Sequence, residues 1–404
     1  MLLVRQVEGP ARIAIGRQAT YQATVFNQSN PAAADLARIN WQVNLDGREI
    51  RRPLAVGAIF KLDIAPDWLG KALTIMPFAN TPTAAVAVTT QVEAAQQPPP
   101  PQPETPAFQV ATRYDSEQAR CYARVNLGEE FYVGSRVPYQ GRIGLSNIYL
   151  NSGPRYDPSA HEAAEGHWAF MIYPTALCES EGYYNRLNTY DRAAFTFGLL
   201  QWAAHTANAN FVLLFRQLLT LPDAAGYFPD LTLRNGHIQQ RRDAGWLDLE
   251  GGGDDLPRLT AYLNPDPNTL TPRVQQVSAK FVNWSNSSRA ARARQDSFAF
   301  ASYQANMADY AQRYDLDGRE DLICLVVADI RHQGRATHSA IQSALAAADP
   351  LAALLAIGAE SYAERIATLQ AAMSDLVSQG KLGRLRYASA ANSFVAPDPP
   401  SHRG

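Results

Sequence analysis

The chain has 404 residues, enough for two or three domains, and its 46% hydrophobic and 18% charged residues support packed cores and argue against wholesale disorder. The formal net charge is −2 and no basic run is interleaved with aromatic residues, which argues against nucleic acid as the main ligand. The cysteines Cys121, Cys178 and Cys324 are widely spaced among apolar neighbours, so we expect free thiols, with no disulfide framework, metal site or cofactor.

The sequence carries no pattern typical of an export signal or a membrane span. The first apolar run, in MLLVRQVEGPARIAIG, is short and interrupted by Arg5 and Glu8. The apolar run 344–359 contains Asp349 and Pro350, so it is expected to be a packed helix. We therefore expect a protein made in the bacterial cytoplasm. If it works in the periplasm or cell wall, a route other than a cleavable signal delivers it.

Residues 1–93 are predicted to form an all-β domain. Short runs such as ATYQATVF, RINWQVNLDG and KALTIMPFAN alternate apolar and polar residues, Asp46-Gly47 is a hairpin signal, and Trp41 is the expected core aromatic. The regular strand spacing favours a sandwich of about seven strands. This pattern resembles the Ig-like modules found beside bacterial and phage-derived hydrolases, which implies a spacer or a docking domain.

The next two segments separate this domain from the rest. The stretch QQPPPPQPETP, within 94–107, favours polyproline II and is expected to be a linker. Residues 108–158 contain two expected strands, FYVGSRVPY and GRIGLSNIYL, and are predicted either as a small domain or as a lead-in to the next one.

Helical patterns dominate from 159 to 393, which predicts a mainly α (α+β) domain. Ser159 and Glu162 have the spacing of a capping box, and Pro174 is expected to end or kink the first helix, so that a second short helix ends at Gly182. Residues 227–270 are expected to be mostly loop, and Asp317 and Glu320 to cap a later helix. The end, 394–404, is expected to be a flexible tail.

The stretch ESEGYYNRLNTYDRAAFTFGLLQW (179–202) holds the candidate active site. Cleavage of a glycosidic bond needs a carboxylic acid that stays protonated and a second polar group that steadies the reacting centre or positions water. Glu181 would end a helix, where the partial negative charge favours the protonated acid, with Leu177 and Tyr184 as apolar neighbours. Asp191 follows in a turn, and Thr196 and Gly198 on the returning strand.

The pattern Glu181-Gly182, Tyr190-Asp191 and Thr196-x-Gly198 resembles the phage-type lysozymes. The resemblance implies that Glu181 is the general acid, that Asp191 positions water or stabilises charge, and that the Thr196 hydroxyl holds water. The spacing from Glu to Thr agrees with the family, whereas the spacing from Glu to Asp is one residue longer, which makes the role of Asp191 less secure.

A second lysozyme-superfamily pattern competes in the same stretch. Glu179-Ser180 and Gly198-Leu199-Leu200-Gln201 resemble the Glu-Ser and Gly-Leu-Met-Gln elements of goose-type lysozymes and lytic transglycosylases, which implies Glu179 as the acid. Two residues on a helix are about 200° apart, so only one of the two glutamates faces a given cleft. Thr196 and Asp191 also align with Glu181, which favours that residue.

The remaining candidates are expected to contact substrate. They are Tyr190, Gly198 and Gln201 within the stretch, and His332 and Gln333 in VADIRHQGRATH. In this second segment, a helix that ends at Gly334 is expected to bring together Asp329, His332, Gln333 and His338. The alternative for this second segment is an ordinary helix C-terminus with favourably placed basic side chains.

Three functions remain open. The first is a muramidase that cleaves β-1,4 bonds between N-acetylmuramic acid and N-acetylglucosamine, as an antibacterial effector of a secretion machine or as a phage lysin, with an immunity protein as a further partner. The second is a lytic transglycosylase that uses Glu179. The third is a non-catalytic component that binds peptidoglycan glycan strands. The expected partners include no nucleic acid, and no membrane span is expected.

Overall fold

The computed structural model describes residues 2–28, 31–93, 107–148, 151–243, 245–251 and 257–397. The chain divides into two compact units, one up to Glu104 and one from Thr105 onward, which are described separately. Except for its last residue, the expected linker 94–107 lies outside the described residues.

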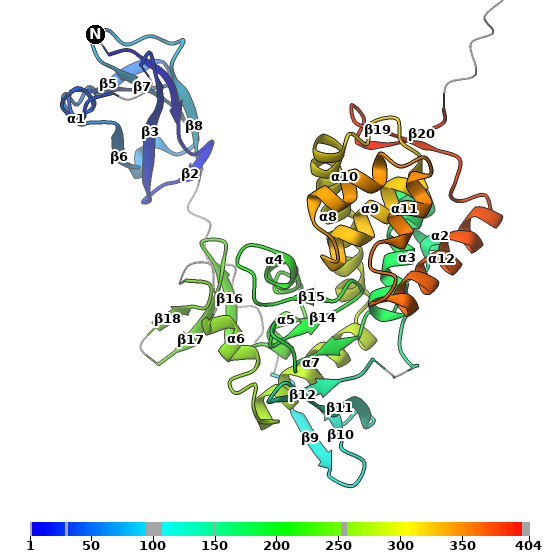
Figure 1. The fold of residues 1–404 in the computed structure, drawn as a ribbon. Helices are drawn as coiled ribbons and strands as arrows, with labels where there is room; N and C mark the ends of the chain where they lie inside the picture. The colour runs from blue at the N-terminus through cyan, green and yellow to red at the C-terminus, as the bar shows by residue number, and fades with distance from the viewer. Residues whose placement is uncertain are drawn as a thin grey trace, which may run out of the picture. The chain divides into compact units, whose positions relative to one another are not determined.

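The first unit is a β-sandwich (Figure 1). Its sheets have the strand orders β1-β3-β6 and β2-β8-β7-β4-β5, and only β2 and β8 pair in parallel. Short helical turns α1 (Ala33–Leu36) and η1 (Pro66–Trp68) connect strands. The strands are β1 (Val4–Glu8), β2 (Arg12–Ala14), β3 (Gln18–Phe26), β4 (Asn40–Leu45), β5 (Arg48–Arg51), β6 (Ile59–Asp63), β7 (Ala72–Phe78) and β8 (Val88–Glu93).

The core of the sandwich forms around Trp41, as the sequence predicts. Trp41 is fully buried, its ring centroid lies 5.4 Å from that of Phe60 in the opposite sheet, and its Nε1 donates to the Gly57 carbonyl at 2.8 Å. Asp46 and Gly47 form the turn between β4 and β5 with positive φ angles of 47° and 81°. Both the aromatic core and the hairpin were therefore readable from local patterns.

In the second unit a sheet joins the segment 107–148 to the candidate stretch. The strand order β15-β14-β13-β12-β11-β10-β9 makes this segment part of one seven-stranded antiparallel sheet, so it is not a separate small domain. Helix α7 packs against β9, β10 and β11. The strands are β9 (Val110–Asp115), β10 (Arg120–Val125), β11 (Phe131–Tyr139), β12 (Arg142–Ser146), β13 (Leu187–Asn188), β14 (Thr196–Phe197) and β15 (Trp202–Ala203).

Helices make up most of the remainder (Figure 1). Helix α3 packs against α2, α8, α9 and α12, and α9 is buried along most of its length. The helices are α2 (Pro158–Glu165), α3 (Trp168–Ser180), α4 (Asn210–Leu218), α5 (Ala224–Tyr227), α6 (Pro257–Leu263), α7 (Pro272–Ser287), α8 (Arg289–Tyr314), α9 (Asp321–Gln333), α10 (His338–Leu345), α11 (Pro350–Ala356) and α12 (Ala363–Ser378).

The expected break at Pro174 is wrong. Helix α3 runs through Pro174 without interruption to Ser180. Proline removes one backbone hydrogen bond and costs roughly 3 kcal/mol in a helix interior. Here Pro174 is buried, and packing of α3 against four other helices outweighs the local cost.

Two expected helix starts are also wrong. The N-cap of α2 is Asp157, whose side chain accepts from the Ser159 N–H, with Pro158 in the first turn, so Ser159 is not the cap. Helix α9 begins after Glu320 without a side-chain cap, and Asp317 accepts instead from the Ser389 N–H at 2.6 Å. Helix α2 is thus capped by a different residue, and Asp317 is bound by a tertiary contact instead of capping α9.

The segment 227–270 is more regular than expected. It contains α6 and the three-stranded sheet β16 (Leu231–Arg234), β17 (His237–Arg242) and β18 (Gly245–Asp248). Asn235 and Gly236, both with positive φ, form the first hairpin turn. An Asn-Gly pair is the strongest short hairpin signal. The expectation that this segment is mostly loop, based on its glycines and prolines, is therefore wrong.

The C-terminal end is structured further than predicted. Strands β19 (Arg386–Ala388) and β20 (Ser393–Val395) pair, and Phe394 is buried. The expected tail from 394 is therefore wrong at its first residues, because Phe394 packs its ring on Trp168 and Tyr387. The last seven residues lie outside the described part.

Candidate functional site

Glu181 lies at the C-terminus of α3 in a strained backbone conformation. Its φ is 53°, in the left-handed region that residues other than glycine seldom adopt, and Gly182 follows with φ 78°. The N–H groups of Glu181 and Gly182 donate to Leu177 O and Ala176 O, and Arg155 donates to Glu181 O. Strain of this kind is retained where surrounding contacts fix it, often at functional sites.

The side chain of Glu181 is half exposed and faces one buried cation. Its exposed fraction is 48%, and its Oε2 lies 3.2 Å from Arg186 Nη2, whose side chain is 1% exposed. Arg186 also donates to Ser180 O at 3.1 Å and Asn147 O at 2.7 Å. The expected desolvation of Glu181 by Leu177 and Tyr184 is therefore wrong, because the carboxylate points to solvent and to Arg186.

The register of strands β12 to β15 aligns a row of mostly polar residues on one side of the sheet. Ser146, Asn188, Thr196 and Ala203 are successive cross-strand partners on β12 to β15. The apolar partners Leu187, Phe197 and Trp202 form the neighbouring row, and all three are buried. Because side chains alternate along a strand, the two rows face opposite sides of the sheet.

Asp191 is held at the end of the polar row. Asn188 Nδ2 donates to Asp191 Oδ2 at 2.9 Å, and the Ala193 N–H donates to Asp191 Oδ1 at 2.9 Å. Burial raises the pKa of Asp191, and the hydrogen bond from Ala193 opposes that rise only in part. Thr196 pairs with Asn188 and is almost fully buried, so Asp191 and Thr196 both flank Asn188.

Asn188 and Arg186 are the site residues that sequence reasoning missed. Arg186 lies just before β13, two residues from Asn188, and its carbonyl accepts from the Gly198 N–H at 2.9 Å. Glu181 contacts Arg186, and Asp191 contacts Asn188. The available signal was the alternation Arg186-Leu187-Asn188, with one apolar residue between two polar ones.

Glu179 belongs to a different cluster. Arg365 Nη1 donates to Glu179 Oε1 at 2.7 Å, and His332 Nε2 lies 3.7 Å from the same oxygen. Arg365 and Arg335 both pair with the fully buried Asp329. Burial alone would raise the pKa of Asp329, but these two guanidinium groups outweigh it and lower the pKa. Glu179 thus faces α9 and α12, whereas Glu181, the left-handed residue after the end of α3, contacts Arg186 just before β13.

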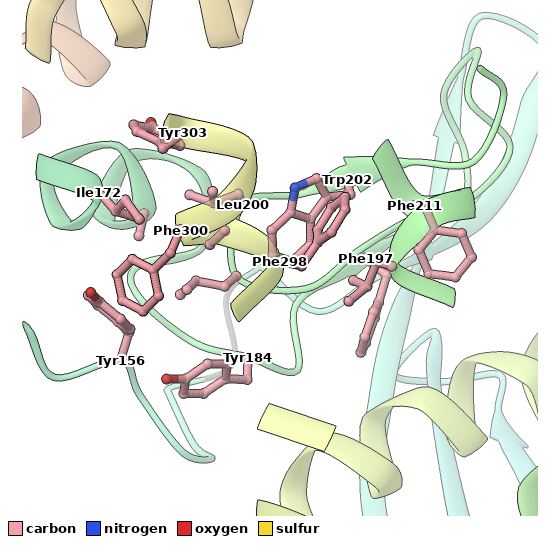
Figure 2. Close-up of a cluster of buried hydrophobic side chains, with 14 of the residues drawn as sticks. Tyr156, Ile172, Tyr184, Phe197, Leu200, Trp202, Phe211, Phe298, Phe300 and Tyr303 are labelled. Carbon is pink, nitrogen blue, oxygen red and sulfur yellow. The ribbon is translucent and has the colours of Figure 1, made fainter. Parts of the chain in front are cut away.

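His332 also borders a neutral pocket of about 270 Å³. Its Nε2 lies 3.1 Å from Leu200 O. Leu200, Trp202, Phe298 and Tyr303, which supply the apolar wall, lie close together in Figure 2. Asn208, Asn210, Ser302 and Asn306 add polar groups, and no acidic or basic side chain other than His332 lines this pocket among the described residues.

The side chains of the other candidate residues make contacts within the protein. Arg335 donates to Gln333 Oε1 at 3.0 Å, so Gln333 stays near Asp329. His338, expected in the same cluster, instead contacts Arg313 and Tyr314. Gln201 donates to Arg186 O and Gly198 O, and the ring centroid of Tyr190 lies 5.8 Å from that of Tyr139.

Gly198 is explained by packing. Its φ is 92°, and a Cβ at this position would lie 2.6 Å from Gln295 Oε1 and 3.0 Å from the Trp202 ring. Gln295 Oε1 accepts from the Leu199 N–H at 2.9 Å. Gln295 and Trp202 therefore fill the space beside Gly198, which was expected to contact substrate.

The three cysteines are free, as predicted, and burial raises the pKa of each thiol to about 12.

Across the described residues, no helix has the length and apolar character needed to span a bilayer. No group of three or more His, Cys, Asp or Glu side chains in that part of the chain is arranged to hold a metal ion.

Comparison with known proteins gives little. No protein-family model matches the chain, and no curated protein sequence matches it. The CARDB domain of the PF1109 protein from Pyrococcus furiosus, crystallised with di-metal ions, is similar over 22% of this chain and 90% of its own, at 13% identity and a TM-score of 0.14. The central fibronectin-III array of RIM-binding protein is similar over 30% of this chain and 40% of its own, at 12% identity and a TM-score of 0.15. At these TM-scores neither similarity identifies the fold of the chain.

Proposed function

We propose that the second unit is a glycoside hydrolase that cleaves the β-1,4 bond between N-acetylmuramic acid and N-acetylglucosamine in peptidoglycan. The proposal rests on two contacts close together in the chain. Glu181 pairs with Arg186. Asn188, two residues after Arg186, donates to Asp191 and is the cross-strand partner of Thr196. A glutamate at a helix end and an aspartate in the turn between β13 and β14 are the two carboxyl groups that such a reaction needs.

In this mechanism Glu181 protonates the glycosidic oxygen. Its half-exposed carboxyl group is accessible to substrate, and Arg186, anchored on Ser180 O and Asn147 O, limits its orientation. Asp191, oriented by Asn188 and the Ala193 N–H, positions water or stabilises the developing positive charge, and the Thr196 hydroxyl holds that water.

A lytic transglycosylase is the second candidate, because one observation favours it. Glu179 is 18% exposed and approaches His332, which lines the neutral aromatic pocket. That chemistry needs one glutamate and no activated water. However, Arg365 already occupies Glu179 Oε1 and joins it to the buried Asp329, which supports a structural role for Glu179.

Mass spectrometry of soluble fragments from purified peptidoglycan separates these mechanisms. The wild type, Glu181→Gln and Glu179→Gln are compared. Reducing-end muramic acid that disappears only in Glu181→Gln supports the hydrolase. 1,6-Anhydro products that disappear only in Glu179→Gln support the transglycosylase. No fragments from the wild type, together with binding to sacculi that Glu181→Gln does not change, would favour the non-catalytic wall-binding component.

For delivery, we propose that the N-terminal sandwich, an Ig-like module in our reading, docks the protein to a secretion machine or phage particle, and that an immunity protein protects a producing cell. The sandwich has its own core around Trp41, separate from that of the second unit. Removal of residues 1–93 should therefore leave hydrolysis of purified peptidoglycan intact and abolish delivery to target cells.

A further inference from the structure

The small sheet β16–β18 has one core face and one outer face. Leu231, Leu233 and Ile238 point to the core. Alternation along the strands and the register of the pairs place the intervening positions of each strand on the outer face. The outer-face residues are Thr232, Arg234, His237, Gln239, Arg241, Trp246 and Asp248.

Trp246 is a large aromatic ring at the surface of this face. It is 42% exposed. The guanidinium carbon of Arg234, which comes from the far strand of the sheet, lies 5.1 Å from the centre of the Trp246 ring. Arg241 is the direct cross-strand partner of Trp246. A cation over the ring face is attracted by the ring quadrupole, so the two side chains hold each other in place across the sheet.

Among the described residues, no carboxylate pairs with the two arginines of this face. Neither Arg234 nor Arg241 forms an ion pair with any described residue. The carboxylate of Asp248 is engaged elsewhere, since its Oδ2 lies 2.9 Å from His237 Nδ1 and its Oδ1 accepts from the Glu250 N–H at 2.8 Å. The guanidinium groups of Arg234 and Arg241 therefore have no carboxylate partner among the described residues.

We propose that the outer face of β16–β18 binds an acidic glycan chain. A flat indole offers an apolar surface to the C–H face of a pyranose ring, and guanidinium groups recognise carboxylates through paired N–H donors. The overall charge of −2 weakens long-range attraction to a dense polyanion such as DNA, whereas a glycan with spaced carboxylates needs only a few local cations. This binding needs neither Glu181 nor Glu179, so it is independent of the reaction proposed above.

Sedimentation of the full-length protein with insoluble particles tests the proposal. Peptidoglycan sacculi supply a β-1,4-linked glycan whose stem peptides carry spaced carboxylates, and chitin supplies a neutral β-1,4-linked polymer for comparison. We expect binding to sacculi to exceed binding to chitin and to weaken as ionic strength rises. Arg234→Gln combined with Arg241→Gln should reduce the affinity for sacculi by about tenfold, and Trp246→Ala should reduce binding to both polymers.

Arg242→Gln is the matched control, because Arg242 is the neighbour of Arg241 and strand alternation turns it away from the outer face. Its affinity for sacculi should stay close to that of the wild type. Wild-type affinity in the double arginine variant, or an equal loss in Arg242→Gln, would overturn the proposal. Displacement from sacculi by DNA at lower concentration than by soluble peptidoglycan fragments would reject the glycan as the ligand. Release of soluble fragments is scored separately, so loss of binding and loss of catalysis are told apart.

Discussion

The guanidinium of Arg186 lies 3.2 Å from the carboxylate of Glu181, yet the arginine is buried and the glutamate is half exposed. The same guanidinium donates to two backbone carbonyls, those of Ser180 and Asn147. Arg186 is therefore needed by the fold whether or not Glu181 is present, whereas Glu181 contributes little packing of its own. Substitution of Glu181 should therefore test catalysis with little change in stability, whereas substitution of Arg186 should mainly change stability.

Glu181→Gln should abolish peptidoglycan cleavage while changing the free energy of unfolding by no more than about 0.5 kcal/mol, as expected for an exposed side chain. Arg186→Met should lower that free energy by about 3 kcal/mol, because two buried carbonyls lose their donors. Urea unfolding combined with fragment release measures both. Substantial residual cleavage by a stably folded Glu181→Gln would remove Glu181 from the mechanism.

Glu179 should behave in the opposite way if its role is structural. Glu179→Ala leaves Arg365 with one partner, Asp329, and should lower the free energy of unfolding by about 2 kcal/mol. Glu179→Gln keeps an oxygen that accepts from Arg365, so it should cost less and retain cleavage. Comparison of the two variants by urea unfolding and fragment release provides the check. Loss of cleavage in a stable Glu179→Gln would instead support the transglycosylase.

The parts predicted correctly from the sequence rest on local patterns. Trp41 in an alternating run, the Asp46-Gly47 turn and the helix end next to Gly182 each depend on residues adjacent in the chain. The candidate site residues Asp191 and Thr196 come from one continuous stretch of the same kind, and their roles stay predictions. Their shared neighbour Asn188 was missed because its importance comes from pairing between strands.

The errors came from tertiary contacts that no local pattern reveals. Pro174 stays inside α3 because several helices bury it. Gly198 has no side chain that would block a substrate, but the side chain of Gln295, 97 residues later, fills the space beside it. The segment 107–148 could not be assigned because its strands complete a sheet with β13, which comes after two helices.

Gly198→Ala tests how tightly this junction is packed. An added Cβ would meet Gln295 Oε1 and the Trp202 ring, and φ of 92° is unfavourable for alanine, so we expect a loss of about 3 kcal/mol. Gly236→Ala is the control, since Gly236 has a similar φ of 79° with open space around it and should lose only about 1 kcal/mol. Equal losses in thermal or urea unfolding would show that backbone strain alone matters.

The buried carboxyl group of Asp296 predicts a specific pH dependence of stability. Burial raises the pKa of Asp296 to about 6, although the Tyr184 hydroxyl donates to it at 2.7 Å and His161 Nε2 lies 3.6 Å away. The unfolded chain has a pKa near 3.9, so between about pH 4 and 6 the folded state binds more protons than the unfolded state. The contribution of Asp296 to stability is therefore present below pH 4 and is lost as the pH rises towards 6.

Asp296→Asn should remove this dependence, because asparagine does not titrate and its oxygen still accepts from Tyr184. The difference in unfolding free energy between the variant and the wild type should grow in favour of the variant by about 2–3 kcal/mol from pH 4 to pH 7. Urea unfolding of both proteins across this range measures it, and the other titrating groups cancel in the difference. A difference that stays constant with pH would mean that Asp296 is ionised in the folded protein throughout, with water or His161 compensating its charge.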